Sequence, residues 1–132
     1  MAVGLRPATA ADEPFLLRVY ASTRADELAA VPWRDADKAA FVAQQFAAQS
    51  AHYARHYTGL SRHVIRVGGV DAGRLLVARW EREIRIVDIA LLPEFRGGGA
   101  GTVLLRGLID EARAAGTPLT IHVERANTAL GL

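Results

Sequence analysis

A run of glycines between an apolar stretch and a helical pattern is the sharpest chemical feature of this sequence. It reads Arg96-Gly-Gly-Gly-Ala-Gly-Thr102, and four of the five residues from 97 to 101 are glycine. None of these five offers a side-chain oxygen, whereas a helix usually begins at a capping Ser, Thr, Asp or Asn. The first N–H groups of the following helix are therefore left open, and the helix dipole favours an anion there. Together with the charge of Arg96, the pattern predicts a pyrophosphate site.

Two other phosphate-binding loops do not fit this run. The Walker pattern needs Gly-Lys-Ser/Thr at the start of the helix, and the run contains no lysine. The dinucleotide fingerprint Gly-x-Gly-x-x-Gly also fails, because its last glycine would fall on Thr102 or on Leu104. A flexible turn without a ligand is the remaining alternative, but two glycines would serve that purpose.

Hydrophobic periodicity and turn residues predict the elements that position this run. Short connections between the middle strands predict an antiparallel meander, with Gly68-Gly69 and Asp71-Ala72-Gly73 as turns. The last strand must then pair in parallel through a helical crossover, and Gly116 ends that helix. The apolar face of that helix comprises Val103, Leu104, Leu108, Ile109 and Ala112. The expected strands are 3–6, 63–67, 75–80, 84–92 and 119–123, and the expected helices run from 9 or 10 to about 28, from a cap at Asp35 into the fifties, and over 99–115.

The second expected helix has an unusual polar and aromatic end. Its inward positions from Gln49 to Tyr57 include His52, Tyr53 and His56. Two interpretations stay open: a half-buried helix face, or a face that lines a pocket. The histidines are spaced i, i+4, but Tyr53 stands where the zincin pattern needs a glutamate and no third ligand is evident. We therefore expect no metal site.

Length and composition narrow the function classes. The 132 residues suffice for one domain, 1–132. The absence of cysteine excludes disulfides, thiolate metal sites and a cysteine nucleophile. A net charge of +2 with scattered basic residues does not indicate a nucleic-acid partner. No stretch has the length of a signal peptide or a membrane span, so a soluble cytoplasmic protein without membrane contact is expected.

At the glycine run the sequence resembles the GCN5-related N-acetyltransferase (GNAT) superfamily. The coenzyme-A signature of that family, Gln/Arg-x-x-Gly-x-Gly/Ala, is matched by Arg96-x-x-Gly99-x-Gly101. The preceding stretch from Asp88 to Phe95 is similar to the family's lead into this loop, and Asn127 resembles the Asn that follows its next strand. The resemblance implies an α/β (α+β) fold with a mixed, mostly antiparallel central sheet flanked by helices, in the element order that periodicity also predicts.

The resemblance also implies a cofactor, acetyl-CoA, and the residues that hold it. The fourth and fifth strands would splay apart, and the pantetheine arm would lie between them like an added strand. One backbone N–H group near the end of the fourth strand would stabilise the thioester oxyanion. The implied cofactor-binding residues are Leu91, Leu92, Pro93, Arg96, Gly97, Gly98, Gly99, Ala100, Gly101, Thr102 and Asn127. The implied activity is N-acetyl transfer to a primary amine by direct attack on the thioester; the alternative is a non-catalytic acyl-CoA-binding or interaction module.

Two residues are candidates for the catalytic base. His122, five residues before Asn127, titrates in the right range and stands where some members that acetylate protein α-amines carry a glutamate. Its alternative role is a partly buried histidine bonded to a backbone carbonyl. Asp88 is the second candidate, through a water or by orienting His122, or else it is paired with Arg79 or Arg85. Glu83 and Glu124 are weaker candidates.

The sequence departs from the family at its C-terminal end. The chain stops at Leu132, inside the helix that Asn127 should open, where the family places a tyrosine acid and then a closing pair of strands. We expect a C-terminally shortened domain, with an exposed sheet edge that a homodimer could cover. The acceptor, a small-molecule or protein amine, and the oligomeric state are not determined by the sequence. Trp33, Tyr53 and Tyr57 could line an acceptor pocket or belong to the core.

Overall fold

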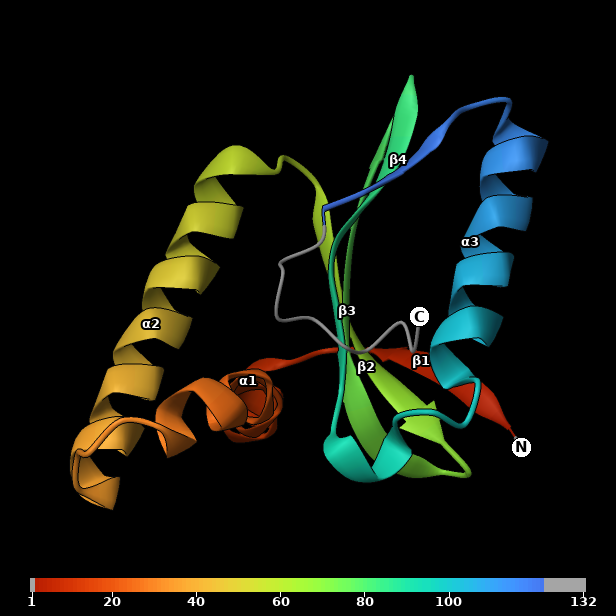
Figure 1. Ribbon diagram of the computed structural model, residues 1–132. Coiled ribbons are helices and arrows are strands. Elements are labelled where there is room, and N and C mark those ends of the chain that lie inside the picture. The colour runs from red at the N-terminus through yellow and green to blue at the C-terminus, as the bar shows by residue number, and fades with distance from the viewer. Residues whose placement is uncertain (1, 123–132) are drawn as a thin grey trace.

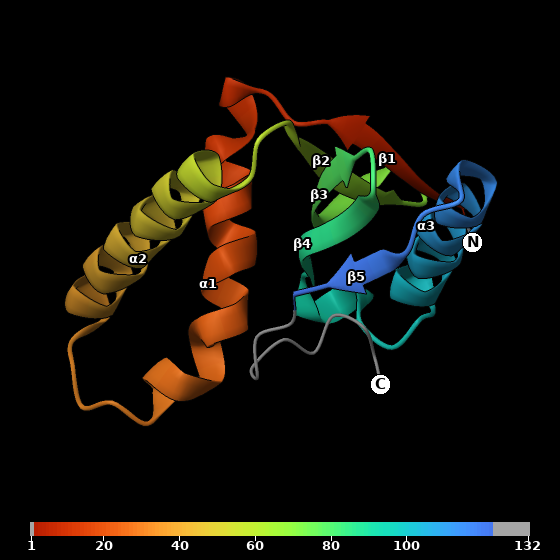
Figure 2. The same cartoon turned by 90° about the horizontal axis from the view of Figure 1, so that it is seen from above.

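The computed structural model describes residues 2–122, which form a five-stranded sheet between two layers of helices (Figure 1). Helices α1 and α2 cover one face of the sheet and α3 covers the other (Figure 2). The predicted element order is confirmed, although α2 begins at Asp35 itself rather than after it. The elements are β1 (Val3–Pro7), η1 (Ala10–Asp12), α1 (Glu13–Ala29), α2 (Asp35–His56), β2 (Leu60–Val67), β3 (Val70–Trp80), β4 (Glu83–Leu91), η2 (Pro93–Phe95), α3 (Ala100–Ala115) and β5 (Leu119–Ile121).

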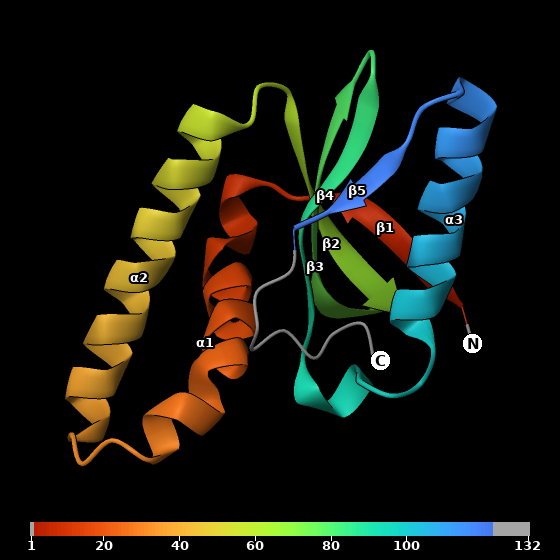
Figure 3. The ribbon, with the colours of Figure 1, turned by 45° about the horizontal axis from the view of Figure 1, so that its top comes forward.

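The five strands lie in sequence order across the sheet. Neighbours run antiparallel from β1 to β4, and β5 runs parallel to β4 (Figure 3). Gly68 and Gly69 both adopt positive φ, 59° and 79°, in the two-residue turn between β2 and β3. That geometry matches the twist of a hairpin and favours glycine. The predicted meander and the parallel last strand are therefore confirmed.

Two irregularities in the strands were not predicted. Ile65 pairs with Gly73 and Arg66 with Asp71, so the ladder passes over Ala72 within β3. The prediction of a turn at 71–73 is wrong, because the chain continues as a strand with one extra residue, which is a β-bulge. A second register shift places an extra residue, Val87, on β4.

Gly73 lets β3 and β4 approach closely at the first of these irregularities. A Cβ atom built there would lie 2.2 Å from the carbonyl oxygen of Ala90 and 3.0 Å from the Cα atom of Leu91. Those atoms belong to the backbone and cannot rotate away. A side chain at position 73 would therefore push the end of β4 from its place.

The sheet carries an apolar core on each face. On the α3 side, Leu104, Leu108 and Ala112 pack against β4 residues such as Ile86 and Ile89. Val103, predicted to share that face, is instead 52% exposed. On the opposite side α1 and α2 pack against β2; that cluster is Leu16, Tyr20, Val42, Phe46 and Val64. Of the helices in residues 2–122, none combines the length and the apolar character needed to cross a membrane.

A salt-bridge cluster fixes the start of α1 to the sheet. The Asp12 carboxylate accepts hydrogen bonds from Arg6 Nη1 at 3.0 Å and Nη2 at 2.8 Å, and from the N–H of Thr9 at 2.8 Å. Arg6 also contacts Asp71 on β3 at 2.9 Å. The bonds from Arg6 and then from Thr9 hold the pKa of Asp12 well below its usual range. The predicted helix start at Thr9 or Ala10 corresponds to the short η1 turn, after which α1 follows.

Candidate functional site

The glycine turn, residues 96–102, is exposed at Gly97, Gly98 and Gly99 and leads into a helix start without a side-chain cap. Gly97 and Gly99 adopt φ of 77° and 88°, values that favour glycine. Helix α3 follows Gly99 without a side-chain cap, and its first bond joins the Val103 N–H to the Gly99 oxygen at 3.0 Å. The N–H groups before Val103 therefore have no partner within the helix. A Cβ at Gly97 or Gly99 would meet no atom within 4 Å, so the predicted uncapped helix start is confirmed.

Arg96 anchors this turn to the end of β4. Its Nε donates to the carbonyl oxygen of Leu91 at 2.9 Å, and its Nη2 donates to Ser22 Oγ on α1 at 3.4 Å. A guanidinium has five N–H donors, and within residues 2–122 these two contacts use only two of them. The remaining donors are available to a ligand, so the role of Arg96 in binding phosphate stays a prediction.

Strand β5 pairs along its whole length, but only with the first part of β4. The ladder runs from Ile84 opposite Leu119 to Ile86 opposite Ile121, and the His122 N–H extends it with a 2.9 Å bond to the Ile86 oxygen. Beyond the extra residue Val87, no strand in the described range pairs with the outer edge of β4 (Figure 3). That edge leads directly to the glycine turn.

The end of β4, residues 91–93, was predicted to offer a backbone N–H group to the thioester, and one such group points away from β3. Leu92 cannot serve, because its N–H donates to the Ala72 oxygen at 2.8 Å, and Pro93 has no N–H. Successive residues of a strand direct their backbone polar groups to alternate edges. The N–H of Leu91 therefore faces the outer edge, where its own carbonyl oxygen accepts the Arg96 bond. Of Leu91, Leu92 and Pro93, Leu91 is therefore the residue whose N–H faces this edge, and its contact with a thioester stays a prediction.

Asp88 forms an ion pair with an arginine, as its alternative role predicted, but the partner is Arg74. Its carboxylate accepts a hydrogen bond from Nη2 of Arg74, and the two side chains are 13% and 5% exposed. The predicted alternative partners are both wrong: Arg79 pairs with Glu111 and Arg85 pairs with Glu83. The extra residue Val87 on β4 explains the difference. It moves the side chain of every later residue of this strand to the opposite face of the sheet from the one that strict alternation predicts.

His122 lies at the end of the described chain, beside Ile86. Its backbone is fixed by the 2.9 Å bond to Ile86, and its side chain is exposed. Within residues 2–122 the imidazole makes no hydrogen bond, so a partly buried histidine bonded to a described carbonyl is not what the structure shows. Its role as a base stays a prediction. Asn127 and Glu124 lie outside the described residues.

Glu83 is bound in a network at the start of β4. Its carboxylate accepts hydrogen bonds from the Thr120 hydroxyl and from Arg85 Nε, the latter at 3.0 Å. The Thr120 bond, and then the Arg85 bond and charge, lower the pKa of Glu83. A carboxylate stabilised in its charged form is a weak base, which argues against a catalytic role.

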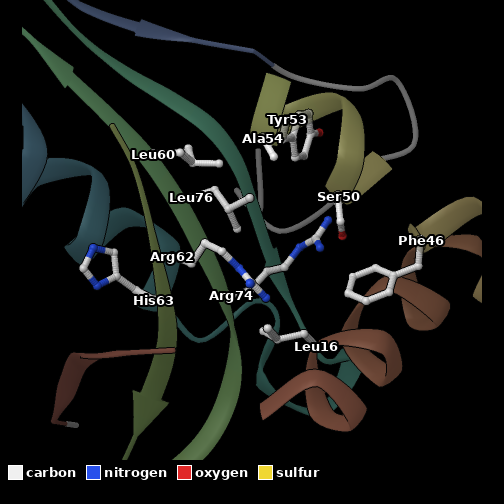
Figure 4. Close-up of a pocket in the computed structure, with 10 residues that line it drawn as sticks. All are labelled: Leu16, Phe46, Ser50, Tyr53, Ala54, Leu60, Arg62, His63, Arg74 and Leu76. Atoms are coloured by element: carbon white, nitrogen blue, oxygen red, sulfur yellow. The ribbon is translucent and has the colours of Figure 1, made fainter. Parts of the chain in front are cut away.

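A cavity of about 110 Å³ lies between α2 and the face of β2 and β3 (Figure 4). Ser50, Tyr53 and Ala54 line it, so this helix end does border a cavity, but of the residues predicted to line a pocket there only Tyr53 does so. Arg74 also lines it and is missed by the sequence prediction, which began this strand at Leu75. A signal was present: Arg74 alternates with Leu76 and belongs to the same apolar stretch.

The other aromatic and histidine candidates do not converge on this cavity. Trp33 is 46% exposed and packs edge-on against Phe41, and Tyr57 stacks on Trp80. The rings of His52 and His56 stack at 4.1 Å between centroids. In the described part of the chain no group of three His, Cys, Asp or Glu residues could hold a metal ion.

Comparison with known proteins identifies a family. The model of the acetyltransferase (GNAT) family matches residues 20–130. No curated protein sequence matches the chain. The fold is similar to that of PaiA N-acetyltransferase from Thermoplasma acidophilum in complex with coenzyme A, at 13% identity and a TM-score of 0.64, over 97% of this chain and 83% of that chain.

Two further solved structures share the fold. A GCN5-related N-acetyltransferase from Rhodopseudomonas palustris is 22% identical, with a TM-score of 0.62 over 98% of this chain and 77% of that chain. A GNAT family acetyltransferase from Elizabethkingia anophelis with acetyl-CoA bound is 19% identical, with a TM-score of 0.53 over 93% of this chain and 66% of that chain.

Proposed function

The chain belongs to the acetyltransferase (GNAT) family, and from this premise we propose that it transfers the acetyl group of acetyl-CoA to a primary amine by direct attack on the thioester. The observation that carries this proposal is the uncapped start of α3, which follows the end of β4, where no strand within residues 2–122 pairs with the outer edge. Related structures with coenzyme A or acetyl-CoA bound support the choice of donor.

The chain's own residues fit such a cofactor. The glycine turn offers open N–H groups at the positive end of a helix dipole, which suit a pyrophosphate. Arg96 adds a positive charge beside that turn while its Nε contacts Leu91. Bound acetyl-CoA supplies an activated acetyl thioester. The N–H of Leu91 would donate to the thioester carbonyl oxygen, where negative charge develops during attack.

We assign removal of the amine proton to His122. An alkyl amine has a pKa near 10 and is mostly protonated at neutral pH, so the reaction needs a proton acceptor. The Asp88 carboxylate is already bonded to Arg74. If Asp88 took up the amine proton, the buried guanidinium of Arg74 would lose its charged partner, which is unfavourable. The imidazole of His122 is exposed and unbonded within residues 2–122, and it is attached to the strand that flanks β4. Asp88 then has a positioning role.

The proposal is tested by thiol release from acetyl-CoA with a panel of primary amines. We expect amine-dependent release, which a non-catalytic acyl-CoA-binding module would not give. His122→Gln should lower kcat by about 10²-fold or more and leave the affinity for acetyl-CoA unchanged, because general bases contribute about 10²–10⁴-fold. His52→Gln, at an exposed histidine on α2, is the matched control. An unchanged pH–rate profile in His122→Gln would exclude the base role.

A further inference from the structure

Arg74 is a buried cation held rigidly on the α2 side of the sheet. It is 4% exposed and lies beside the neighbouring rings of Tyr20 and Phe46, with its guanidinium carbon 5.7 Å from each ring centroid. Its Nη2 donates to Gln49 Oε1 at 2.7 Å and to Asp88. These contacts fix the plane of the guanidinium before any ligand arrives.

The guanidinium keeps donors that no described residue uses. Nε is buried without a hydrogen-bond partner, and Nη1 has no acceptor within residues 2–122. Both hydrogens of Nη2 are used, so three of the five donors are unused. A buried donor without an acceptor is destabilising, which is a reason to expect an acceptor from beyond residues 2–122, such as a ligand.

The cavity beside Arg74 offers donors and no acidic side chain. Its charged lining residues are Arg74 and Arg62, and no Asp or Glu lines it. Figure 4 shows the guanidinium of Arg74 reaching toward Ser50, whereas the imidazole of His63 points away from the cavity. Leu16 and Phe46 are among the apolar residues of its wall. A volume of about 110 Å³ corresponds to roughly three or four water molecules. That is room for a carboxylate or amide group and one or two adjoining carbons.

The sheet register places this cavity next to the expected acetyl site. Arg74 pairs with Ala90, the residue before Leu91, and Leu76 pairs with Asp88. Neighbouring strands lie about 4.8 Å apart, so the wall of the cavity and the outer edge of β4 are separated by about one strand spacing. A small molecule can therefore place one end in the cavity and its amine at the edge of β4.

We propose that this cavity binds a carboxylate or amide oxygen of the acceptor, so that the acceptor is an amino acid or its amide rather than a polyamine. The inference rests on the proposed function and names its substrate class. The oxygen accepts hydrogen bonds from the unused Arg74 donors, and the adjoining carbon contacts Leu16 and Phe46. Arg62 is paired with Glu13 and Arg74 with Asp88, so the preference rests on hydrogen bonding rather than on net charge. A polyamine would bring further donors, and the unused Arg74 donors need an acceptor.

The direct test is binding of four primary amines that share a three-carbon chain to the coenzyme-A-saturated protein. We expect β-alanine and β-alaninamide to bind at least tenfold more tightly than propylamine and 1,3-diaminopropane, measured by calorimetric titration. Comparison of the first two shows whether the site prefers a charged or a neutral oxygen. Equal affinity for all four, tighter binding of the diamine, or no binding of the first two would overturn the inference.

Two alanines on α2 give a matched pair of variants. Ala54 lines the cavity and Ala51 does not, and both are exposed, so leucine at either position should leave the fold intact. Ala54→Leu should raise Kd and KM for β-alanine at least tenfold with little change in kcat, and Ala51→Leu should change neither. Propylamine should be insensitive to both substitutions. An equal effect of the two variants would contradict the inference.

A conservative change at Arg74 isolates its hydrogen-bonding geometry. Arg74→Lys keeps a positive charge beside Asp88 but loses the planar fork of donors. We expect a tenfold or larger rise in Kd for β-alanine and an unchanged Kd for propylamine, with folding checked by Tm. Unchanged β-alanine affinity in a folded variant would overturn the assignment. Binding of β-alanine without acetyl transfer would support the inference and refute the proposed function. Equal transfer to all four amines would support the proposed function and overturn the inference.

Discussion

The glycine turn and the arginine cluster are built in opposite ways. The glycine turn, residues 96–102, offers backbone N–H groups of an uncapped helix start, and there is open space around Gly97 and Gly99. The arginine cluster (Arg74, Asp88, Gln49, Tyr20 and Phe46) uses side chains from two helices and two strands, all packed around one buried charge. The first site needs only a local sequence, while the second exists only when distant segments have folded together.

This difference separates ligand binding from stability. Within the glycine turn Gly97, Gly98, Gly99 and Thr102 are exposed and only Ala100 belongs to the core, so substitutions at the exposed positions that keep the backbone should act mainly on the cofactor. The arginine cluster connects α1, α2, β3 and β4, so the loss of one member should destabilise the fold as well as the cavity. The following predictions test that separation, beginning with the largest expected effect.

Arg74→Met should cost about 3–5 kcal/mol of unfolding free energy, because it leaves the carboxylate of Asp88 buried without its partner. The double change Arg74→Met with Asp88→Asn should recover most of that loss. Urea denaturation of the three proteins measures both effects. If the single change costs no more than the double change, the ion pair is not the link that holds this cluster together.

Gly73→Ala should cost about 1–3 kcal/mol or more, because the new Cβ would lie 2.2 Å from the Ala90 carbonyl oxygen. Gly4→Ala on β1 is the matched control, since a Cβ there meets no atom within 4 Å. Denaturation midpoints of both variants check this. Equal losses would mean that β3 and β4 can separate at this point without penalty, contrary to the role given to Gly73.

Thr102→Glu should move stability and cofactor affinity in opposite directions. Thr102 is exposed in the first turn of α3, where an acid interacts favourably with the helix dipole by about 0.3–1 kcal/mol. The same carboxylate would repel a pyrophosphate, so the Kd for acetyl-CoA should rise at least tenfold. Thr102→Gln, which adds no charge, should change the Kd much less. Equal affinity of the Glu and Gln variants for acetyl-CoA would contradict the assignment of an anion site at this helix start.

His63 should make the stability depend on pH near neutrality. Both ring nitrogens lack partners within residues 2–122, and burial, then the charge of Arg79, lowers the pKa of His63. The unfolded chain therefore binds this proton first as the pH falls. Stability is complete above the ordinary histidine pKa of about 6.5 and decreases below it. His63→Leu should flatten the pH dependence of the denaturation midpoint between pH 7 and 5; an unchanged slope would contradict this account.

The glycine turn and the element order could be predicted from the sequence because both depend on local chemistry. Gly97 and Gly99 are needed for their positive φ, and Gly68-Gly69 and Gly116 end their elements for the same reason. The arginine cluster could not be predicted in the same way. Its formation depends on the extra residues Ala72 and Val87, which shift the register of two ladders and turn Asp88 toward Arg74. Such shifts follow from close strand packing rather than from residue periodicity.

The same limit explains the exposed Val103. Periodicity counts every apolar residue near the inner stripe of a helix, but the orientation of α3 on the sheet decides which of them are covered. The predicted N–H contact with a thioester was likewise spread over three residues, Leu91, Leu92 and Pro93. Only the bond from Leu92 to Ala72 shows which neighbouring N–H group remains directed to the outer edge.

The central claim is that the glycine turn binds the pyrophosphate of acetyl-CoA, and a thermal-shift titration tests it most directly. Gly99→Ala and Gly99→Asp share the strain of a side chain at φ of 88°, and only the second adds a charge. We predict a saturable rise in Tm with acetyl-CoA, absent with ATP and NAD, for the native protein; the rise should be largely kept in Gly99→Ala and lost in Gly99→Asp. No rise with acetyl-CoA, or equal rises in the two variants, would contradict the claim.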